Sequence, residues 1–366
     1  SIEDLLALHV NIVDIACHLN ISRSTVYRII HYHNIPYKRF TDISDNDLKK
    51  AIQDIKENHP HAGEVYLLGH LRSRDIYVPR SRLRDFIHAV DQAGISMRQN
   101  SVINRRVYWS PCPNFVWHLD GLHKMVRWKF VVHGGIDGYS RLIVFLSCAT
   151  SNRALTVLEQ FNTAVEHYGW PLHVRTDHGG ENSQVWHAMT QHHNTERSVI
   201  AGSSVHNERI ERMWRDINRI VSSQFREMFY HLESEGILDP LNEADLFCLH
   251  WVYSDLINKI LSEHTRAHNH HGVSTEGNFT PLQLHHANIH LMELHRHQNG
   301  SHISHIQDRL SRGTIDIEHV RFQPPSSLLQ QLRQEVPCDE VTMANAVEMY
   351  RKAVHFVGTH LLENQG

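Results

Sequence analysis

Residues 174–182 read VRTDHGGEN: a short β-prone run stops at Asp177, and two glycines and a second acid, Glu181, follow. Glycine ends a strand easily and loops are polar, so one interpretation is an ordinary turn with a solvated Glu181. In the other interpretation, Asp177 lies at the rim of a sheet and binds something that requires a carboxylate. The flanking segments distinguish between the two.

The surrounding residues predict a mixed sheet with helices against it. Strands are expected in FVWHLDG (115–121), ending at Asp120, in a hairpin over 129–149, at 172–177 and at 198–202. Helices are expected at 154–169, 183–193 and 207–232. The last helix has an apolar stripe formed by Ile210, Met213, Trp214, Ile217 and Val221. This order of elements predicts an α/β domain over residues 114–236.

Three acids of this domain invite a common explanation. Asp120 and Asp177 both end predicted strands, and Glu211 lies near the start of the long helix. If the strands are neighbours, the three carboxylates gather at one edge of the sheet and raise one another's pKa. Divalent cations neutralise such a group. Mg²⁺ binds one or two protein carboxylates and keeps places for phosphate oxygens and water, and two ions about 4 Å apart stabilise a phosphoryl displacement.

At these residues the chain resembles the catalytic core of the retroviral-integrase and DDE-transposase superfamily. The matching segments are WHLDG (117–121), GGIDGYSRLIVF (134–145), RTDHGGEN (175–182), SVHNERIERMWRD (204–216) and HNHHGVSTEGNFTPLQL (268–284). With an N-terminal layout like that of insertion-sequence transposases, the resemblance covers roughly residues 1–290. It implies an RNase H-like fold in which Asp120, Asp177 and Glu211 are the catalytic, metal-binding acids and hold two Mg²⁺ or Mn²⁺ ions.

Other charged residues nearby have separate interpretations. Asp137 lies in the turn IDGYSR, where an aspartate commonly binds its own backbone, and Glu208 is the rival of Glu211 for the third acid. The resemblance implies a DNA contact for Arg215, one turn after Glu211. His178 departs from the family, since many integrases have Asn there, and it is either a DNA contact or a tolerated change.

Residues 1–40 predict a helix–turn–helix unit. Asn11 and Ser22 are expected to cap its two helices. The exposed side chains at the start of the second helix suit a DNA major groove, and they are Arg23, Ser24, Thr25, Tyr27 and Arg28. A helical hairpin with a solvated face is the alternative.

The rest of the chain divides into four further segments. Residues 41–97 predict a second helix–turn–helix-like unit, in which Arg80, Arg82 and Arg84 either contact phosphates or form a solvated helix end. Residues 98–113 are expected to be a linker, and 237–290 a helical extension of the core. Residues 291–366 have no assigned role, although an amphipathic helix at 341–362 suggests oligomerisation.

Composition and charge narrow the function classes. The formal net charge of −4 is uneven, because basic residues are in excess over residues 1–110 and acidic ones over 221–366. Nucleic-acid contacts are therefore expected in the first two thirds of the chain. The five cysteines are scattered, which argues against a disulfide framework, and no apolar run approaches the roughly 18 residues of a membrane span.

The leading hypothesis is a DDE-type DNA recombinase that carries out two-metal hydrolysis and strand transfer on element ends and target DNA. A dimer or tetramer is implied, since two DNA ends must be joined. Resemblance to integrase-core proteins of animal genomes implies a nuclear location, or a cytoplasmic one in a prokaryote. Two alternatives are a transposon-derived DNA-binding or scaffolding protein that keeps the fold without catalysis, and a nuclease without strand transfer.

Overall fold

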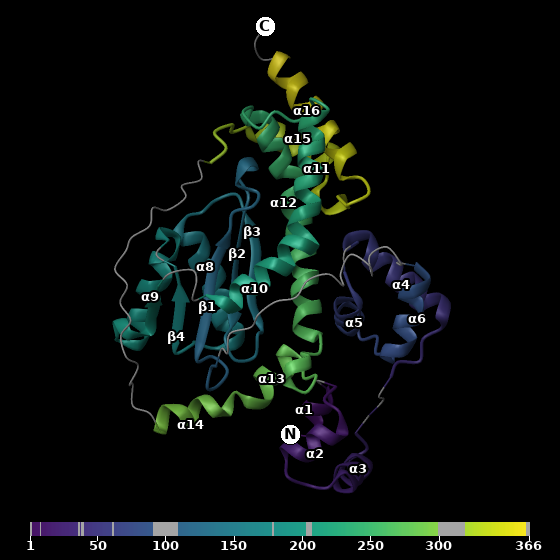
Figure 1. Ribbon diagram of the computed structural model, residues 1–366. Helices are drawn as coiled ribbons and strands as arrows, with labels where there is room; N and C mark the ends of the chain where they lie inside the picture. Colours follow the sequence, from purple (N-terminus) through teal and green to yellow (C-terminus); the bar gives the residue numbers. More distant parts are fainter. Residues whose placement is uncertain are drawn as a thin grey trace.

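The computed structural model describes residues 2–7, 9–35, 37, 40–60, 62–90, 109–177, 179–202, 207–298 and 319–363 (Figure 1). His178 and residues 98–108 of the predicted linker lie outside these ranges.

A five-stranded mixed sheet forms the centre of the molecule. Its strands are β1 (Val116–Leu122), β2 (Val131–Asp137), β3 (Ile143–Ala149), β4 (His173–Thr176) and β5 (Val199–Ala201), in the spatial order β3-β2-β1-β4-β5. The first three strands are antiparallel, whereas β4 and β5 run parallel to β1. The predicted α/β core is therefore confirmed. One boundary was wrong, because β1 does not end at Asp120: Gly121 and Leu122 continue to pair with β2.

Both faces of the sheet are covered, and the alternation of side chains along β1 decides which residues meet which helix. Trp117 and Leu119 pack against α8 (Ala154–Tyr168) and α9 (Ser183–His193). Because successive side chains of a strand point to opposite faces, His118 and Asp120 face the other side. Helix α10 (Glu208–Ile217) lies there, and its Met213 and Trp214 pack against β2 at Gly134.

The long helix predicted at 207–232 is interrupted by one wider turn. After α10, residues Asn218–Ser222 form a π-helical turn, and α11 (Ser223–Ser234) follows. All five residues of the predicted apolar stripe are buried. Ile217, Val221 and Phe225 are all fully buried. The wider turn therefore rotates the helix by the extra residue and keeps its apolar side against the core.

The first N-terminal unit contains α1 (Ile2–Ala7), α2 (Ile12–His18) and α3 (Arg23–Tyr32). The predicted caps are present: the Asn11 side chain accepts from the Val13 and Asp14 amides, and the Ser22 hydroxyl accepts from the Thr25 amide. Val26 is fully buried between α2 and α3. Phe279 and Ala287 pack against the small core of this unit, which therefore contacts the region after the sheet.

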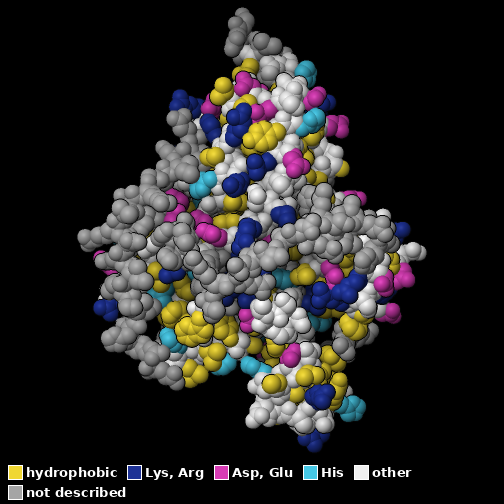
Figure 2. Space-filling model, in the orientation of Figure 1, with side chains coloured by type: hydrophobic (Ala, Val, Ile, Leu, Met, Phe, Trp, Pro, Cys, Tyr) yellow, Lys and Arg dark blue, Asp and Glu magenta, His cyan; other side chains and the backbone are white. Residues whose placement is uncertain are grey.

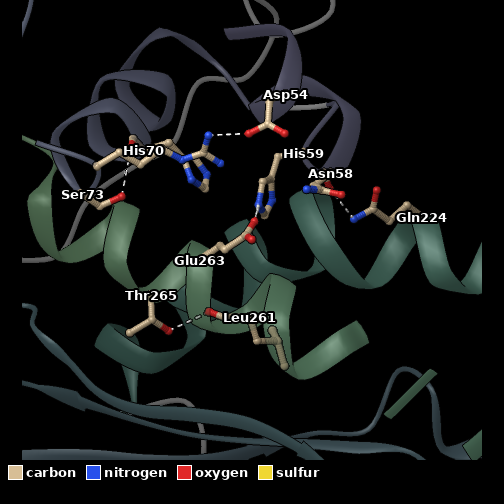
Figure 3. Close-up of polar contacts among 10 residues, drawn as sticks. Asp54, Asn58, His59, His70, Ser73, Gln224, Leu261, Glu263 and Thr265 are labelled. Carbon is tan, nitrogen blue, oxygen red and sulfur yellow. Dashed lines mark hydrogen bonds and ion pairs between the residues drawn. The ribbon is translucent and has the colours of Figure 1, made fainter. Parts of the chain in front are cut away.

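The second unit contains α4 (Asp45–Asn58), α5 (Glu64–Arg72) and α6 (Arg80–Val90), and it packs against the long helix α12 (Glu243–His270). The backbones of α5 and α12 approach so closely that a methyl group on Gly69 would overlap the Ala267 carbonyl. Figure 3 shows the polar contacts of this joint, in which His59 binds Glu263 at 3.0 Å and the Gln224 amide donates to Asn58 O at 3.3 Å.

Helix α12 runs beside the sheet and is followed by α13 (Pro281–Asn288), α14 (His290–Gln298), α15 (Ser326–Glu335) and α16 (Ala346–Glu363) (Figure 1). The apolar face of α16 is used within the chain: Tyr350, Ala353 and Val357 are buried in the core that α12 shares. That face is therefore not a free surface for the suggested oligomerisation. Among the described helices, none combines the length and apolarity of a membrane span.

Candidate active site

Asp120 and Asp177 lie on neighbouring parallel strands at matched positions. Strand β1 pairs with β4 through Val116 with His173 and His118 with Arg175. Extending this register by two residues brings Asp120 opposite Asp177, the residue just after β4. Neighbouring strands are about 4.8 Å apart, so the expectation that these two strands are adjacent is confirmed, and their two carboxylates lie at the same edge of the sheet.

The Asp120 carboxylate is held by two donors. The Gly121 amide donates to Oδ1 at 2.9 Å, and the Trp214 indole N–H of α10 donates to Oδ2 at 2.9 Å. The pKa of Asp120 is raised to about 7, first by burial and then by the charges of Asp177 and Glu181, against the Trp214 and Gly121 hydrogen bonds, which lower it. The helical spacing predicted Trp214 only as part of the apolar stripe, and its polar contact with Asp120 was not predicted.

A glycine makes the approach of Trp214 possible. Gly134 is the partner of Asp120 across the β1–β2 pair. A methyl group on Gly134 would lie 2.7 Å from the Trp214 ring and 2.8 Å from the Met213 methyl. These distances are too short for van der Waals contact, so only glycine leaves room for α10 to lie this close to Asp120.

The turn after β4 fixes Asp177. Its Oδ1 accepts from the Gly179 amide at 3.1 Å and from the Asn182 side chain at 3.4 Å. Thr176 anchors the same turn, because its hydroxyl donates to the Asp177 carbonyl and accepts from the Trp186 indole at 2.9 Å.

The start of α10 is attached to β1 by Asn207, a buried residue that the sequence reasoning did not single out. The His118 ring donates to Asn207 Oδ1, and the Asn207 amide donates to the Leu119 carbonyl at 3.3 Å. The Glu211 amide then donates to the Asn207 carbonyl at 3.1 Å. These contacts set the position of α10 relative to the acidic pair.

Glu211 and Arg215 lie on α10 with their side chains exposed. Trp214, which contacts Asp120, is three residues after Glu211, so both residues belong to the same part of the helix. In the described part of the chain, no three His, Cys, Asp or Glu side chains form a group closed enough to hold a metal ion. The two aspartates are thus brought together, while the Glu211 carboxylate does not complete such a group with them.

A family model for the integrase core domain matches residues 107–300, more than half of the chain. The chain belongs to the integrase core domain family. No curated protein matches the sequence. Similar solved structures include the trimeric HTLV-2 integrase catalytic core in complex with magnesium, which is 19% identical, covers 49% of this chain and 100% of its own, and has a TM-score of 0.33. A second similar structure is an intasome of simian T-cell lymphotropic virus in complex with PP2A regulatory subunit B56 gamma. It is 14% identical, the match covers 71% of this chain and 76% of the intasome chain, and the TM-score is 0.38.

Within this integrase core, Glu181 differs from its prediction. It was expected to be solvated, yet only 6% of it is exposed, because the short 3₁₀ turn Gly180–Asn182 folds its side chain inward. Burial raises its pKa, as does the nearby charge of Asp177. Its pattern in the sequence, an acid after two glycines, carries no signal that separates a buried side chain from a solvated one.

Asp137, the acid of the predicted hairpin turn, has the structural role expected of it. It is fully buried, its Oδ1 accepts from the Asn114 amide at 2.8 Å, and its Oδ2 accepts from the amide and hydroxyl of Ser140 at 2.7 Å. Both oxygens are therefore engaged in holding the hairpin against the start of β1.

Arginines form an exposed stripe on the integrase core helix α10 and the π-helical turn. Arg212, Arg215 and Arg219 are exposed and spaced by three and four residues, which places them on one side of the helix. Figure 2 shows Lys and Arg side chains over the middle of one face, where α10, α11 and α12 lie in Figure 1. Of these three residues, only Arg215 was singled out from the sequence.

The candidate DNA-contacting residues of the N-terminal units fall into two groups. Arg23, Ser24, Tyr27 and Arg28 of α3 are exposed, and Thr25 is half-buried beside the Ser22 cap. The three arginines of α6 are paired with acids of their own unit: Arg80 and Arg84 with Glu64, and Arg82 with Asp45. Any phosphate that contacts this second group competes with those carboxylates.

Proposed function

We propose that this integrase-core protein is a DDE-type DNA recombinase that hydrolyses and transfers phosphodiester bonds of DNA with two divalent ions. The observation that carries the proposal is the matched position of Asp120 and Asp177 on adjacent parallel strands, with α10 fixed beside them by Trp214 and Asn207. Membership of the integrase core domain family supports the same reaction class.

The donor set suits Mg²⁺ or Mn²⁺. These ions prefer carboxylate oxygens, and two carboxylates at one sheet edge, with a third acid nearby, form a strongly anionic site that lacks a compensating cation among the described residues. Asp120 and Asp177 would hold the ions, with Glu211 of α10 as the third ligand. When bound, such ions supply charge neutralisation to the attacking and leaving oxygens of a phosphodiester.

The chain's own residues have assigned parts in this proposal. The Trp214 indole keeps the Asp120 carboxylate oriented, and the Asn207 contacts keep the Glu211 helix against β1. Arg212, Arg215 and Arg219 suit the DNA backbone, because exposed arginines bind phosphates without reading sequence. Helix α3 would contact the element end, and His178 and the α6 arginines would add further DNA contacts. Assembly as a dimer or tetramer and action in the nucleus belong to the same proposal.

The test uses the purified full chain, random-sequence double-stranded oligonucleotides and a supercoiled plasmid target, with Mg²⁺ or Mn²⁺. We expect joined products that are lost in Asp120→Asn, Asp177→Asn and Glu211→Gln, while each variant keeps the wild-type unfolding midpoint and DNA affinity. Joining that survives Asp120→Asn at the wild-type rate would remove the acidic pair from the reaction.

A DNA-binding or scaffolding role without catalysis is the second candidate, and the exposed position of Glu211 favours it. In this case the same assay gives DNA binding but neither cleavage nor joining with either metal. Cleavage without joining would instead identify a nuclease. These three outcomes separate the recombinase from both alternatives.

A further inference from the structure

The turn that follows β4 buries an acid, Glu181, that forms no ion pair with any residue the structure describes. Glu181 is 6% exposed, and its Oε2 atom is buried without a hydrogen-bond partner among the described residues. A buried carboxylate oxygen with no donor is costly. A side chain kept in this position therefore suits a positively charged partner, such as a bound cation.

The position of Glu181 points to what that partner is. The charge of Glu181 raises the pKa of Asp120, and the charge of Asp177 raises the pKa of Glu181. The three carboxylates therefore form one anionic group. The His123 ring lies near this anionic group, because the charge of Asp177 raises its pKa. Its Nε2 atom is also buried without a hydrogen-bond partner among the residues described. Glu181 thus lies close enough to the two aspartates of the proposed cation site for their charges to act on one another.

Gly179 shows that the backbone makes room for this carboxylate. A methyl group on Gly179 would overlap the carboxylate of Glu181, while its φ of −65° is one that any residue adopts. The glycine is therefore explained by space for Glu181 and not by backbone conformation.

We infer that Glu181 is a positioning residue of the cation site: its buried charge strengthens divalent-ion binding by Asp120 and Asp177. The inference deepens the proposed function and rests on it. Glu181 acts through the aspartate pair and does not itself need to touch the ion, in agreement with the lack of a closed three-ligand group in the described chain. At the separations of one site, an added negative charge is worth at least a tenfold change in affinity for a divalent cation, on the order of the Coulomb energy at an effective dielectric constant of about 20.

The experiment measures Mn²⁺ binding to the full chain by the EPR signal of free Mn²⁺. Glu181→Gln keeps the size of the side chain beside Gly179 and removes its charge, so we expect Mn²⁺ affinity to fall by about tenfold or more. Unfolding in the absence of metal should be unchanged or require more denaturant, because like-charge repulsion is relieved. Glu166→Gln, the same change at an exposed position of α8, is the matched control and should bind Mn²⁺ as the wild type does.

Glu181→Asp separates charge from shape. It keeps the charge on a shorter stem, and we expect it to retain clearly more Mn²⁺ affinity than Glu181→Gln. Equal loss in both variants would assign Glu181 a role in shape only and overturn the inference, as would a Glu181→Gln affinity equal to that of Glu166→Gln.

Failure of the inference and failure of the proposed function give different results. If Asp120→Asn and Asp177→Asn lose Mn²⁺ binding while Glu181→Gln retains it, the inference fails and the function stands. If the wild-type chain binds no Mn²⁺ above the level of Asp120→Asn, the metal-dependent function fails and the inference fails with it.

Discussion

Asp120 is held from two directions, by its own strand through the Gly121 amide and by α10 through the Trp214 indole. A hydrogen bond to a charged group contributes about 1.5–3 kcal/mol. Trp214→Phe keeps most of the apolar volume and removes the donor, so we expect the free energy of unfolding to fall by about 1–3 kcal/mol. We also expect roughly tenfold weaker Mn²⁺ binding and slower strand transfer.

Trp251→Phe is the control for that change, because its indole donates to the Val336 carbonyl at 3.0 Å, on α12 and away from the acids. Both variants lose one indole hydrogen bond. Equal effects of the two on Mn²⁺ binding would show that the Trp214 contact has no specific role.

We expect replacement by alanine to have opposite effects on stability at Gly134 and at Gly358. Gly134→Ala should lower the free energy of unfolding by about 1–3 kcal/mol, the usual cost of overpacking, because the added methyl meets Trp214 and Met213 at 2.7 and 2.8 Å. In α16, no described atom lies within 4 Å of a methyl on Gly358, so Gly358→Ala should raise stability by about 0.5–1 kcal/mol. Urea unfolding of both variants tests the pair, and a stabilising Gly134→Ala would contradict the packing described for α10.

At the scale of elements, the joint between α5 and α12 contains histidines whose pKa is strongly lowered. Burial lowers the pKa of His70 to about 2 and that of His268 to about 3, and it places the pKa of His264 well below its usual value. Charged groups face these rings from several elements. They are Arg74 after α5, Arg266 on α12, Arg212 on α10 and Arg141 before β3, besides the neighbouring rings of His59 and His271. Glu263 binds His59 at 3.0 Å, and the charge of Asp216 acts on His271.

This joint predicts a loss of stability in mild acid. Above about pH 6.5 the three histidines are neutral in both the folded and the unfolded chain. As the pH falls below 6.5, the unfolded chain binds protons that the folded chain does not accept until about pH 2–3. Each of the three therefore removes about 1.4 kcal/mol per pH unit at most, so several kcal/mol are lost between pH 6.5 and 5.

Urea unfolding at pH 7.5, 6 and 5 measures that slope. His70→Leu should reduce the slope by at most about 1.4 kcal/mol per pH unit, whatever it does to the stability at pH 7.5, since one titrating group is removed. The slope that remains includes His118, His133 and His250, whose pKa values are also lowered by burial. A free energy of unfolding that is constant from pH 7.5 to 5 would show that the joint does not respond to protons.

At the scale of the whole molecule, the two N-terminal units predict different DNA contributions. Arg23 and Arg28 are exposed on α3, whereas Arg80 is paired with Glu64. Each phosphate contact contributes about 0.9 to the slope of log affinity against log salt. Arg23→Ala with Arg28→Ala should therefore weaken binding and reduce the slope by up to about 1.8, while Arg80→Ala should change it less. Fluorescence anisotropy with duplex DNA from 50 to 300 mM salt provides the comparison, and a larger slope change for Arg80→Ala would reverse the assignment.

Patterns within single elements were readable from the sequence. The alternation in β1, the helical spacing after Asn207 and the caps at Asn11 and Ser22 each depend on neighbours a few residues away, and they led to the correct sheet and to the Asp120–Asp177 pair. Contacts between distant segments were not readable. The Asn207 anchor joins residues 89 positions apart, and the inward turn of Glu181 depends on the packing of the whole sheet edge. For the same reason the α16 face was interpreted as a free surface although α12 covers it.

The close approach of Gly69 to Ala267 has a practical consequence for dissecting the protein. Because α5 lies backbone to backbone against α12, a fragment that starts at Trp109 would expose to water the apolar face of α12 and the imidazoles of His264 and His268. Such a fragment would be prone to precipitate, whereas one that starts near Asp45 would keep the helices that cover α12. Expression trials of the integrase core alone should therefore keep α4 to α6.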